Sequence, residues 1–379
     1  MTRHALAPLL LLLLAGCDKP APGPTSSNAP SSTAPAAQPA SPATPAANPA
    51  ADQPASGAMP YGLPEPKPKS PGSVRLVTYN VENLFDDFDD PALTGSVDDK
   101  DETKPAEHRA AAARAIKALS ADIVALQEVE SDRALKWWLA EQGLDKEFPF
   151  VVSLDAGDGR GIEQSVISRF PLANPTQWIK LPLEGEHPKD LGSRPNPDFG
   201  KPLTLHRSPL AVDVTIPKGD GRPDDYTLTL FVLHNKAGRD SAYWREFEAH
   251  KHAELIASLD KAKPGRNIAV LGDFNARPDE ASFMIYLDEA NPTRLHDVFE
   301  GIRRNDPLFQ THASNRIIDH ILVNTNLRHE ILTDSRFVLG MPLPPRNAPF
   351  DGPKPPGYAS DHLPVVVDLI PKDIDPAAR

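Results

Sequence analysis

Five short segments place carboxylate, amide and imidazole side chains directly after apolar runs. They are residues 78–83, 126–128, 233–236, 272–275 and 360–364. Each apolar run predicts a buried strand, so we expect the polar side chains at strand ends along one edge of a sheet. Such a group of side chains is suited to metal-assisted attack of water on a phosphate ester.

The first candidates are metal ligands, because hydrolysis of a phosphodiester requires neutralisation of charge. Mg²⁺ prefers oxygen ligands and usually binds one or two carboxylates while it keeps several waters. Glu128 directly follows the apolar run at 123–127 and is the leading candidate ligand. Asn80 and Glu82 lie two residues apart, so an extended strand directs both to one face, where they can hold the hydration shell of a metal. A core amide beside an edge carboxylate explains this spacing equally well.

Acid–base candidates come from the last two segments. Asp273 and Asn275 repeat the two-residue spacing: the carboxylate can orient or deprotonate water, and the amide can donate to a phosphate oxygen. An Asx turn is the structural alternative. His362 can act as a base or as a donor to the phosphate. Asp319 is the better candidate to hold its imidazole in one tautomer, because the adjacent Asp361 is expected on the opposite face of the strand.

The segment at 233–236 contributes two further cationic or hydrogen-bonding groups. His234 and Lys236 lie two residues apart, and both can donate to the phosphate or to a developing oxyanion. The other histidines are assigned surface or structural positions: His187 and His206 in a long loop, His250 and His252 on a polar helix, and His320 beside Asp319.

The first 72 of the 379 residues are expected to lie outside the folded domain. The apolar run at 5–14 is too short to span a bilayer and is typical of a signal peptide, for which we expect residues 1–16. The Leu-Ala-Gly-Cys ending resembles a bacterial lipobox, in which Cys17 becomes the lipidated first residue. Residues 17–72 have the Pro/Ala/Ser-rich composition of a disordered tether. We therefore expect a bacterial cell-envelope protein, lipid-anchored at the periplasmic or outer surface.

Residues 73–370 are expected to form one domain, with a tail at 371–379. The domain contains no cysteine, which excludes a disulfide and a thiol nucleophile. The net charge of −12 argues against a broad electropositive surface for nucleic acid, although bound cations and a basic rim can offset it. Strand patterns alternate with helical ones and several neighbours resemble hairpins. This predicts an α/β (α+β) fold in which helices flank two packed mixed sheets. We expect a monomer.

The elements of the domain follow from periodicity and turn signals. The expected strands are 74–79, 122–126, 150–153, 164–168, 210–216, 226–234, 267–271, 316–323 and 364–369, and the expected helices are 105–119, 131–142 and 241–259. Long loops are expected to decide substrate choice; they are 86–104, 180–208 and 341–359.

Together the five segments resemble the endonuclease/exonuclease/phosphatase superfamily of pancreatic deoxyribonuclease and the abasic-site endonucleases. The motifs follow the family's order over residues 74–369, and Gly-Asp-Phe-Asn with Ser-Asp-His and an upstream Gln-Glu is a specific combination. The resemblance implies a four-layer α/β sandwich and a bound Mg²⁺, with Mn²⁺ or Ca²⁺ as alternatives.

The resemblance also assigns roles to individual residues. Four residues would surround the metal: Asn80, Glu82, Glu128 and Asp361. Asp273 and Asn275 would position water and phosphate, while His234 and His362 would contact the scissile phosphate and Asp319 would support His362. The general base stays open between Asp273 and His362. Asn80, Lys236 and Arg160 are candidates for substrate binding, although Glu163 replaces the aspartate that usually follows the Arg160 turn in exported members.

The leading hypothesis is a nuclease that cleaves DNA or RNA, and its partner would be nucleic acid or another phosphodiester. The alternatives are a sphingomyelinase-like lipid phosphodiesterase, a small-molecule phosphatase and a non-enzymatic envelope adaptor. The lipid alternative requires an apolar membrane-facing loop, for which residues 341–358 are the candidate, with Met341, Leu343, Phe350 and Tyr358.

Overall fold

The computed structural model describes residues 58–89, 102–219, 223–302, 305–346, 348–349 and 352–374. The expected signal peptide, Cys17 and residues 17–57 of the expected tether lie outside the described residues. Within the described part of the chain, no helix combines the length and the apolar character that a membrane span requires.

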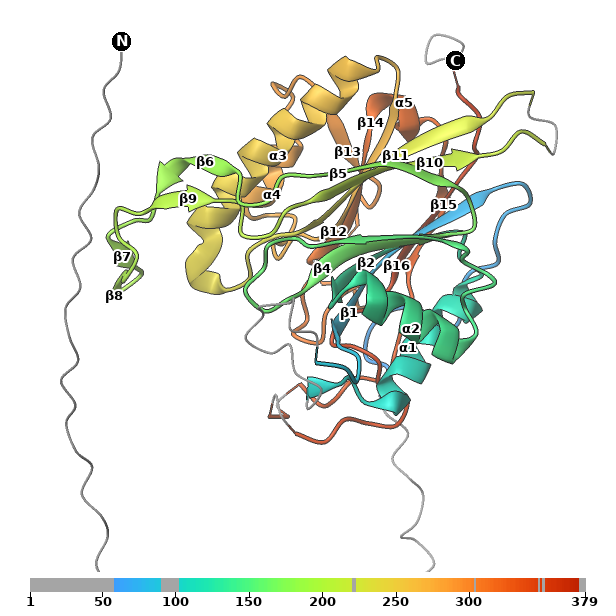
Figure 1. The fold of residues 1–379 in the computed structure, drawn as a ribbon, viewed down its shortest axis with the longest axis horizontal. Coiled ribbons are helices and arrows are strands. Elements are labelled where there is room, and N and C mark those ends of the chain that lie inside the picture. Colours follow the sequence, from blue (N-terminus) through green and yellow to red (C-terminus); the bar gives the residue numbers. More distant parts are fainter. Residues whose placement is uncertain are drawn as a thin grey trace, which may run out of the picture. The chain divides into compact units, whose positions relative to one another are not determined.

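Two six-stranded mixed sheets form the centre of the domain (Figure 1). The strand order in the first sheet is β15 (Ile331–Val338), β16 (Val365–Leu369), β1 (Val74–Leu84), β2 (Ile123–Val129), β4 (Glu163–Ser168) and β3 (Phe150–Leu154). In the second it is β13 (Leu295–Asp297), β14 (Asp319–Asn324), β12 (Asn267–Asp273), β11 (Tyr226–His234), β10 (Leu210–Ile216) and β5 (Leu172–Gln177). The predicted pair of mixed sheets is confirmed.

Each sheet contains a central parallel pair, β1 with β2 and β11 with β12, while the other neighbours run antiparallel. Parallel strands end at the same edge of a sheet, where open α/β folds place their ligands. Four of the five predicted motifs lie at the carboxyl ends of these strands, and the fifth, at 360–364, directly precedes β16. The topology therefore brings segments that are far apart in the sequence to shared sheet edges.

Helices flank the two sheets (Figure 1). The first sheet is accompanied by α1 (Ala106–Leu119) and α2 (Asp132–Gln142), and the second by α3 (Ala242–Ala262), α4 (Ala281–Tyr286) and the short α5 (Thr325–Arg328). Two single 3₁₀ turns, η2 (Arg239–Ser241) and η3 (Pro307–Phe309), lie in the connections. The helix predicted at 241–259 is present as α3 and ends three residues later, at Ala262.

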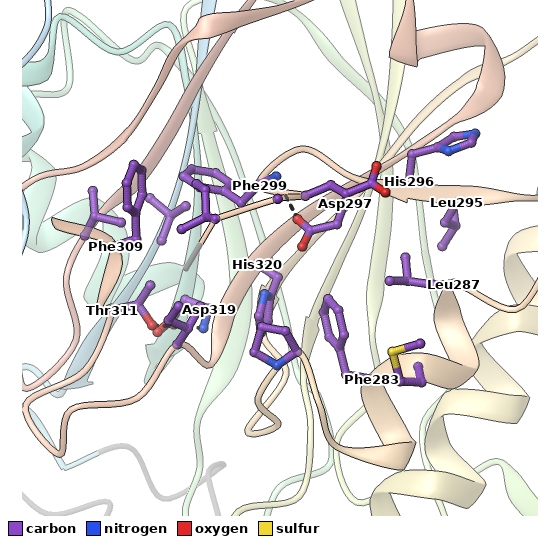
Figure 2. A pocket seen from close by; sticks show the side chains of 18 of the residues that line it. Phe283, Leu287, Leu295, His296, Asp297, Phe299, Phe309, Thr311, Asp319 and His320 are labelled. Atoms are coloured by element: carbon purple, nitrogen blue, oxygen red, sulfur yellow. Dashed lines mark hydrogen bonds between the residues drawn. The ribbon is translucent and has the colours of Figure 1, made fainter. Parts of the chain in front are cut away.

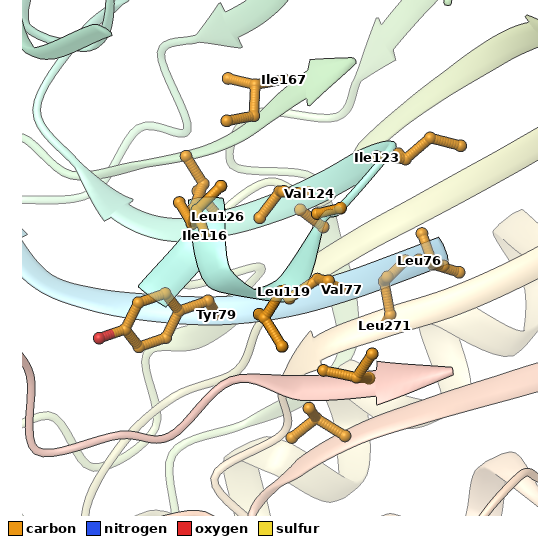
Figure 3. Packing of buried hydrophobic residues seen from close by; sticks show 14 of the residues in the cluster. Leu76, Val77, Tyr79, Ile116, Leu119, Ile123, Val124, Leu126, Ile167 and Leu271 are labelled. Atoms are coloured by element: carbon orange, nitrogen blue, oxygen red, sulfur yellow. The ribbon is translucent and has the colours of Figure 1, made fainter. Parts of the chain in front are cut away.

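The main core lies between the two sheets. Successive residues of a central strand point to opposite faces of its sheet, so they pack in different apolar clusters. Leu271 of β12 belongs to the same apolar cluster as Leu76 and Val77 of β1 (Figure 3). The next residue back on β12, Val270, instead packs in the cluster that contains Ile256 of α3. Strands that are apolar on both faces are expected where a sheet is covered on both sides.

The expected tether is shorter than composition suggested. Tyr61 and Leu63 pack against the main core, and Leu63 forms a β-bridge with Leu339. Gly340 allows this approach, since a Cβ there would lie 2.6 Å from the carbonyl oxygen of Tyr61. Two apolar side chains thus attach residues 58–72 to the domain, despite a proline-rich sequence that does not favour a helix or strand.

The segment expected as a long loop at 180–208 contains regular structure. Two small ladders pair β6 (Pro182–Glu186) with β9 (Pro202–Thr204), and β7 (Asp190–Leu191) with β8 (Arg194–Pro195). Leu183, Leu203 and Leu205 form a separate apolar cluster. The many prolines masked the weak alternation of these short strands. Strands β5, β13 and β15 were also not predicted, and β14 begins at Asp319 instead of residue 316.

Glu330 forms a buried pair with Tyr226 and supplies a test of pH-dependent stability. The Tyr226 hydroxyl donates to Glu330 Oε2, and the backbone N–H of Ile374 donates to Oε1. Burial, aided by the charge of Asp373, raises the pKa of Glu330 from 4.5 to about 8. A raised carboxyl pKa means that folding takes up a proton, so this contribution to stability is complete below the unfolded pKa and is lost as pH rises through about 8.

We expect Glu330→Gln to leave stability nearly unchanged near pH 5 and to raise it above wild type near pH 9. The amide stays neutral, accepts from Ile374 and donates to Tyr226. At about 1.4 kcal/mol per pKa unit, the rise from 4.5 to about 8 corresponds to at most about 5 kcal/mol, and solvent screening of this incompletely buried carboxyl should reduce the gain at high pH to on the order of 2 kcal/mol. Denaturant unfolding at both pH values measures it. An equal effect of the substitution at both pH values would contradict the ionisation argument.

Candidate active site

The predicted site residues converge on one cleft of about 1250 Å³. Eight of the eleven line it directly: Glu128, Arg160, His234, Lys236, Asp273, Asn275, Asp361 and His362. The other three are attached through hydrogen bonds: Asn80 Nδ2 donates to Asp273, the Glu82 N–H donates to Asn80, and Asp319 accepts from His362. Strand ends from both sheets therefore supply the cleft.

Three of these residues have left-handed backbone conformations. The φ angles are 51° at Glu82, 64° at Glu128 and 50° at Asn275. Such angles in non-glycine residues cost on the order of 1–3 kcal/mol and persist where the surrounding structure imposes them. Glu82 is therefore not extended, and the premise that it shares a strand face with Asn80 is wrong. Likewise, the Asn275 N–H donates to Asp273 Oδ1 at 2.8 Å, so the Asx turn is present, yet both side chains still line the cleft.

His362 is held by Asp319 in the way the sequence predicts. His362 Nδ1 lies 2.9 Å from Asp319 Oδ2. Its backbone N–H donates to the Ser360 hydroxyl at 3.0 Å, and that hydroxyl donates to the Asn80 carbonyl at 2.8 Å. Burial opposes protonation of the ring, but the carboxylates of Asp319 and Asp273 outweigh it and raise the pKa of His362 well above its usual value. The imidazole is thus charged and presents Nε2 to the cleft.

Asp273 lies at the centre of the group. It is buried, and its Oδ2 accepts from the side-chain amides of Asn275 at 3.1 Å and Asn80 at 3.3 Å. The same oxygen lies 3.5 Å from His234 Nε2 and 3.7 Å from His362 Nε2. Burial raises the pKa of Asp273 to about 7, although the charge of His362 opposes the shift. A carboxylate in this state can exchange protons near neutral pH.

Glu128 links the two sheets across the cleft. Its Oε1 accepts from Arg160 Nη2 at 3.3 Å and lies 3.7 Å from His234 Nε2, and its Oε2 accepts from the Asn83 N–H at 3.0 Å. Burial and the nearby charge of Arg207 lower the pKa of His234 well below its usual value, so this ring is neutral. Its Nδ1 has no hydrogen-bond partner among the described residues.

Glu82 lies behind the cleft wall, beside the buried Lys104. Burial and the charge of Asp361 raise the pKa of Glu82. The Tyr358 hydroxyl donates to Glu82 Oε2 at 2.6 Å. Burial lowers the pKa of Lys104, while the charges of Glu82, Asp361 and Glu128 all oppose that shift. Three carboxylates therefore act on one buried ammonium group.

These residues fit a hard divalent cation. Glu82, Glu128 and Asp361 supply carboxylate oxygens, which Mg²⁺, Mn²⁺ and Ca²⁺ all accept, although among the described residues these three do not form a group with ligand atoms within 4.8 Å of one another. Burial and the charge of Asp361 raise the pKa of Glu82, and a cation beside these carboxylates would favour their charged forms. Histidine and carboxylate atoms also lie within 4.8 Å of one another in two groups, His312 with Asp361 and His362, and Asp273 with Asp319 and His362.

Sequence reasoning missed several residues of the cleft. His312 Nε2 lies 3.2 Å from Asp361 Oδ2, and its ring packs edge-on against that of His362 at 4.5 Å. His206, assigned to a loop without a role, lines the cleft and lies 3.4 Å from the buried Asp158, which also pairs with Arg207 at 2.8 Å. None of these residues ends an apolar strand run, so periodicity carried no signal for them.

Two other histidine assignments are settled by burial. His252 is buried on α3, with Nδ1 2.8 Å from the Tyr286 hydroxyl, so it is structural. Polar and apolar residues do not separate into two clear faces along α3, so the sequence pattern does not indicate which side of the helix is buried. His320 is structural as predicted, because it is buried and its Nε2 lies 2.9 Å from the Ala276 carbonyl oxygen.

A comparison with models of protein families matched residues 77–362 to the Endonuclease/Exonuclease/phosphatase family. The chain belongs to the endonuclease/exonuclease/phosphatase family. The resemblance inferred from the motifs is therefore confirmed. Members of this family are hydrolases of phosphate esters and are typically dependent on a divalent metal. A search of curated proteins found no match to this family member.

Several solved structures are similar to this family member. The human Nocturnin catalytic domain is 16% identical, with 78% of this chain and 94% of that chain covered and a TM-score of 0.48. Truncated TDP2 from Caenorhabditis elegans is 15% identical, with coverage of 78% and 97% and a TM-score of 0.47. An endonuclease/exonuclease/phosphatase from Bacteroides vulgatus is 17% identical, with coverage of 79% and 99% and a TM-score of 0.46.

Proposed function

We propose that this family member is a metal-dependent nuclease that cleaves DNA or RNA at a bacterial cell envelope, where lipid on Cys17 anchors it. The observation that carries the substrate class is the charge around the cleft. Lys236, Arg239 and Arg316 line it, and none of the three forms an ion pair within the described part of the chain. Unpaired cations beside a carboxylate-rich centre suit a polyanion that carries phosphates on both sides of the scissile one.

A lipid phosphodiesterase would need an apolar loop that faces the membrane, but the described apolar side chains of the candidate loop are buried. Met341, Leu343 and Tyr358 are all buried, with exposed fractions of 8%, 2% and 1%. The fourth apolar candidate, Phe350, lies outside the described residues. The described apolar side chains at 341–358 therefore contribute to the core and to the support of Glu82, and they do not form a surface for lipid.

The proposed roles follow from the contacts. Glu82, Glu128 and Asp361, with Asn80 beside them, would hold Mg²⁺ or a similar ion, which when bound neutralises phosphate charge and acidifies water. Asp273 accepts a proton from the attacking water, and Asn275 donates to a non-bridging oxygen. As the water oxygen bonds to phosphorus, the bond to the leaving ester oxygen breaks, and His362, kept charged by Asp319, contacts the scissile phosphate from Nε2 and donates its proton to that oxygen. Neutral His234 donates from the other side of Asp273, and Arg160 and Lys236 contact neighbouring phosphates.

The function test is cleavage of nucleic acid by the full-length chain. Supercoiled plasmid and a single-stranded RNA should be incubated with Mg²⁺, with Mg²⁺ plus excess chelator, and with Mg²⁺ restored after chelation. We expect cleavage that chelation abolishes and that added metal restores. Cleavage in excess chelator, or cleavage of neither substrate, would overturn the proposal. Fractionation of cells that produce the wild type or Cys17→Ser tests anchoring: only the wild type should sediment with membranes.

A further inference from the structure

A second cavity, of about 440 Å³, lies beside α4, β13 and β14. Its described lining residues are all different from those of the cleft, and the catalytic-cleft side of its wall is formed by Asp319. Figure 2 shows Phe283, Phe299 and Phe309 around this space, together with Asp297 and the imidazole of His320. A cavity of this size that is lined by aromatic rings and a few polar groups is typical of small-molecule sites.

Two polar side chains in the wall, Asp297 and His320, can accept hydrogen bonds. The Asp297 carboxylate accepts from the Phe299 N–H at 2.9 Å, which leaves its second oxygen available. His320 is neutral, because burial lowers its pKa. Its Nε2 is 2.9 Å from the Ala276 carbonyl oxygen and must carry the proton to donate to it. The other ring nitrogen is consequently an acceptor. Both residues therefore suit a ligand that carries N–H donors.

The uncompensated charge in the wall is negative. Asp297 forms no ion pair with any described residue, whereas Arg294, the cation in the lining, is paired with Glu289. Asp319 is paired with His362. Burial raises the pKa of Asp297, and the charge of Glu300 adds to the shift, while His320 and Arg336 oppose it without forming an ion pair with the carboxylate. A bound cation would supply the missing partner.

We propose that this cavity is a second binding site, which takes an organic cation: a protonated amine on an aromatic or aliphatic body. The ammonium group pairs with Asp297 and donates towards His320. The apolar body packs among Phe283, Phe299 and Phe309, whose ring faces attract cations. The site is separate from the phosphate ester cleft, but its occupant lies against Asp319, the residue that holds His362.

Calorimetric titration of the full-length chain with 2-phenylethylammonium and with its neutral analogue 2-phenylethanol tests the proposal. We expect wild type to bind the ammonium at least about tenfold more tightly than the alcohol, because only the ammonium brings charge to the carboxylate and the rings. Asp297→Asn keeps the acceptor for the Phe299 N–H and should remove this preference. Asp288→Asn is the matched control, since Asp288 makes the same two-residue turn with Ala290 at 2.9 Å outside the cavity, and it should retain the preference.

Three results would overturn the proposal: equal affinity for the two probes, no binding of either probe, or an undiminished preference for the ammonium in folded Asp297→Asn. Circular dichroism establishes that each variant is folded. The comparison of the two probes on wild type does not depend on any substitution, so it decides the matter even when a variant does not fold.

Discussion

Replacing His362 by alanine is expected to lower the rate of phosphodiester cleavage about a thousandfold. A positioned acid–base or donor group contributes roughly 10²–10⁴ in rate, and a donor to developing negative charge contributes about 10²–10³. His362 combines the two requirements, because Asp319 fixes its ring at 2.9 Å and its Nε2 faces Asp273 at 3.7 Å. Single-turnover cleavage of a labelled oligonucleotide measures the loss.

Two variants place this loss at the site. Asp319→Asn keeps a polar contact to His362 but removes the charge that favours the imidazolium, so we expect a smaller loss of about ten- to a hundredfold. His250→Ala removes an exposed imidazole from α3 and should leave the rate unchanged. A His362→Ala enzyme that retains full activity would exclude this cleft as the catalytic centre.

Glu128→Gln is expected to weaken metal binding by at least about a hundredfold. Loss of a residue that only supports a ligand lowers metal affinity about ten- to a hundredfold, and loss of a direct ligand should cost more. The amide keeps an acceptor for the Asn83 N–H but loses the charge that faces Arg160 and the cation. Calorimetric titration with Mn²⁺ reports the affinity directly. The metal concentration for half-maximal cleavage should rise in parallel.

The matched control for this substitution is Glu147→Gln. Glu147 pairs with Arg169 at 2.9 Å on the surface of the same sheet, away from the cleft. Its loss should change neither metal affinity nor cleavage. If Glu128→Gln binds Mn²⁺ as tightly as wild type does, the metal lies elsewhere, and the group formed by His312, Asp361 and His362 becomes the position to test.

The strand-end residues were predictable because each carries a local signal. Asp273 and His234 follow continuous apolar runs, and such runs require burial wherever the chain places them. Because β11 and β12 are parallel, both end at the same edge of their sheet, and His234 and Asp273 meet there. The choice of Asp319 as the partner of His362 was correct, but its premise was wrong: Asp361 does not lie on the opposite face, because it lines the same cleft and its Oδ1 is 3.8 Å from His362 Nε2.

The sequence by itself therefore determined the family, the two mixed sheets and eight of the residues that line the cleft. Only the tertiary structure decided the left-handed turns at Glu82 and Glu128, the contact of His312 with Asp361 and the packing of Tyr61 and Leu63 against the core. Their common physical reason is that non-local packing sets them. A loop has no periodicity that predicts its partners, and a strained backbone angle persists only where distant segments hold it in place.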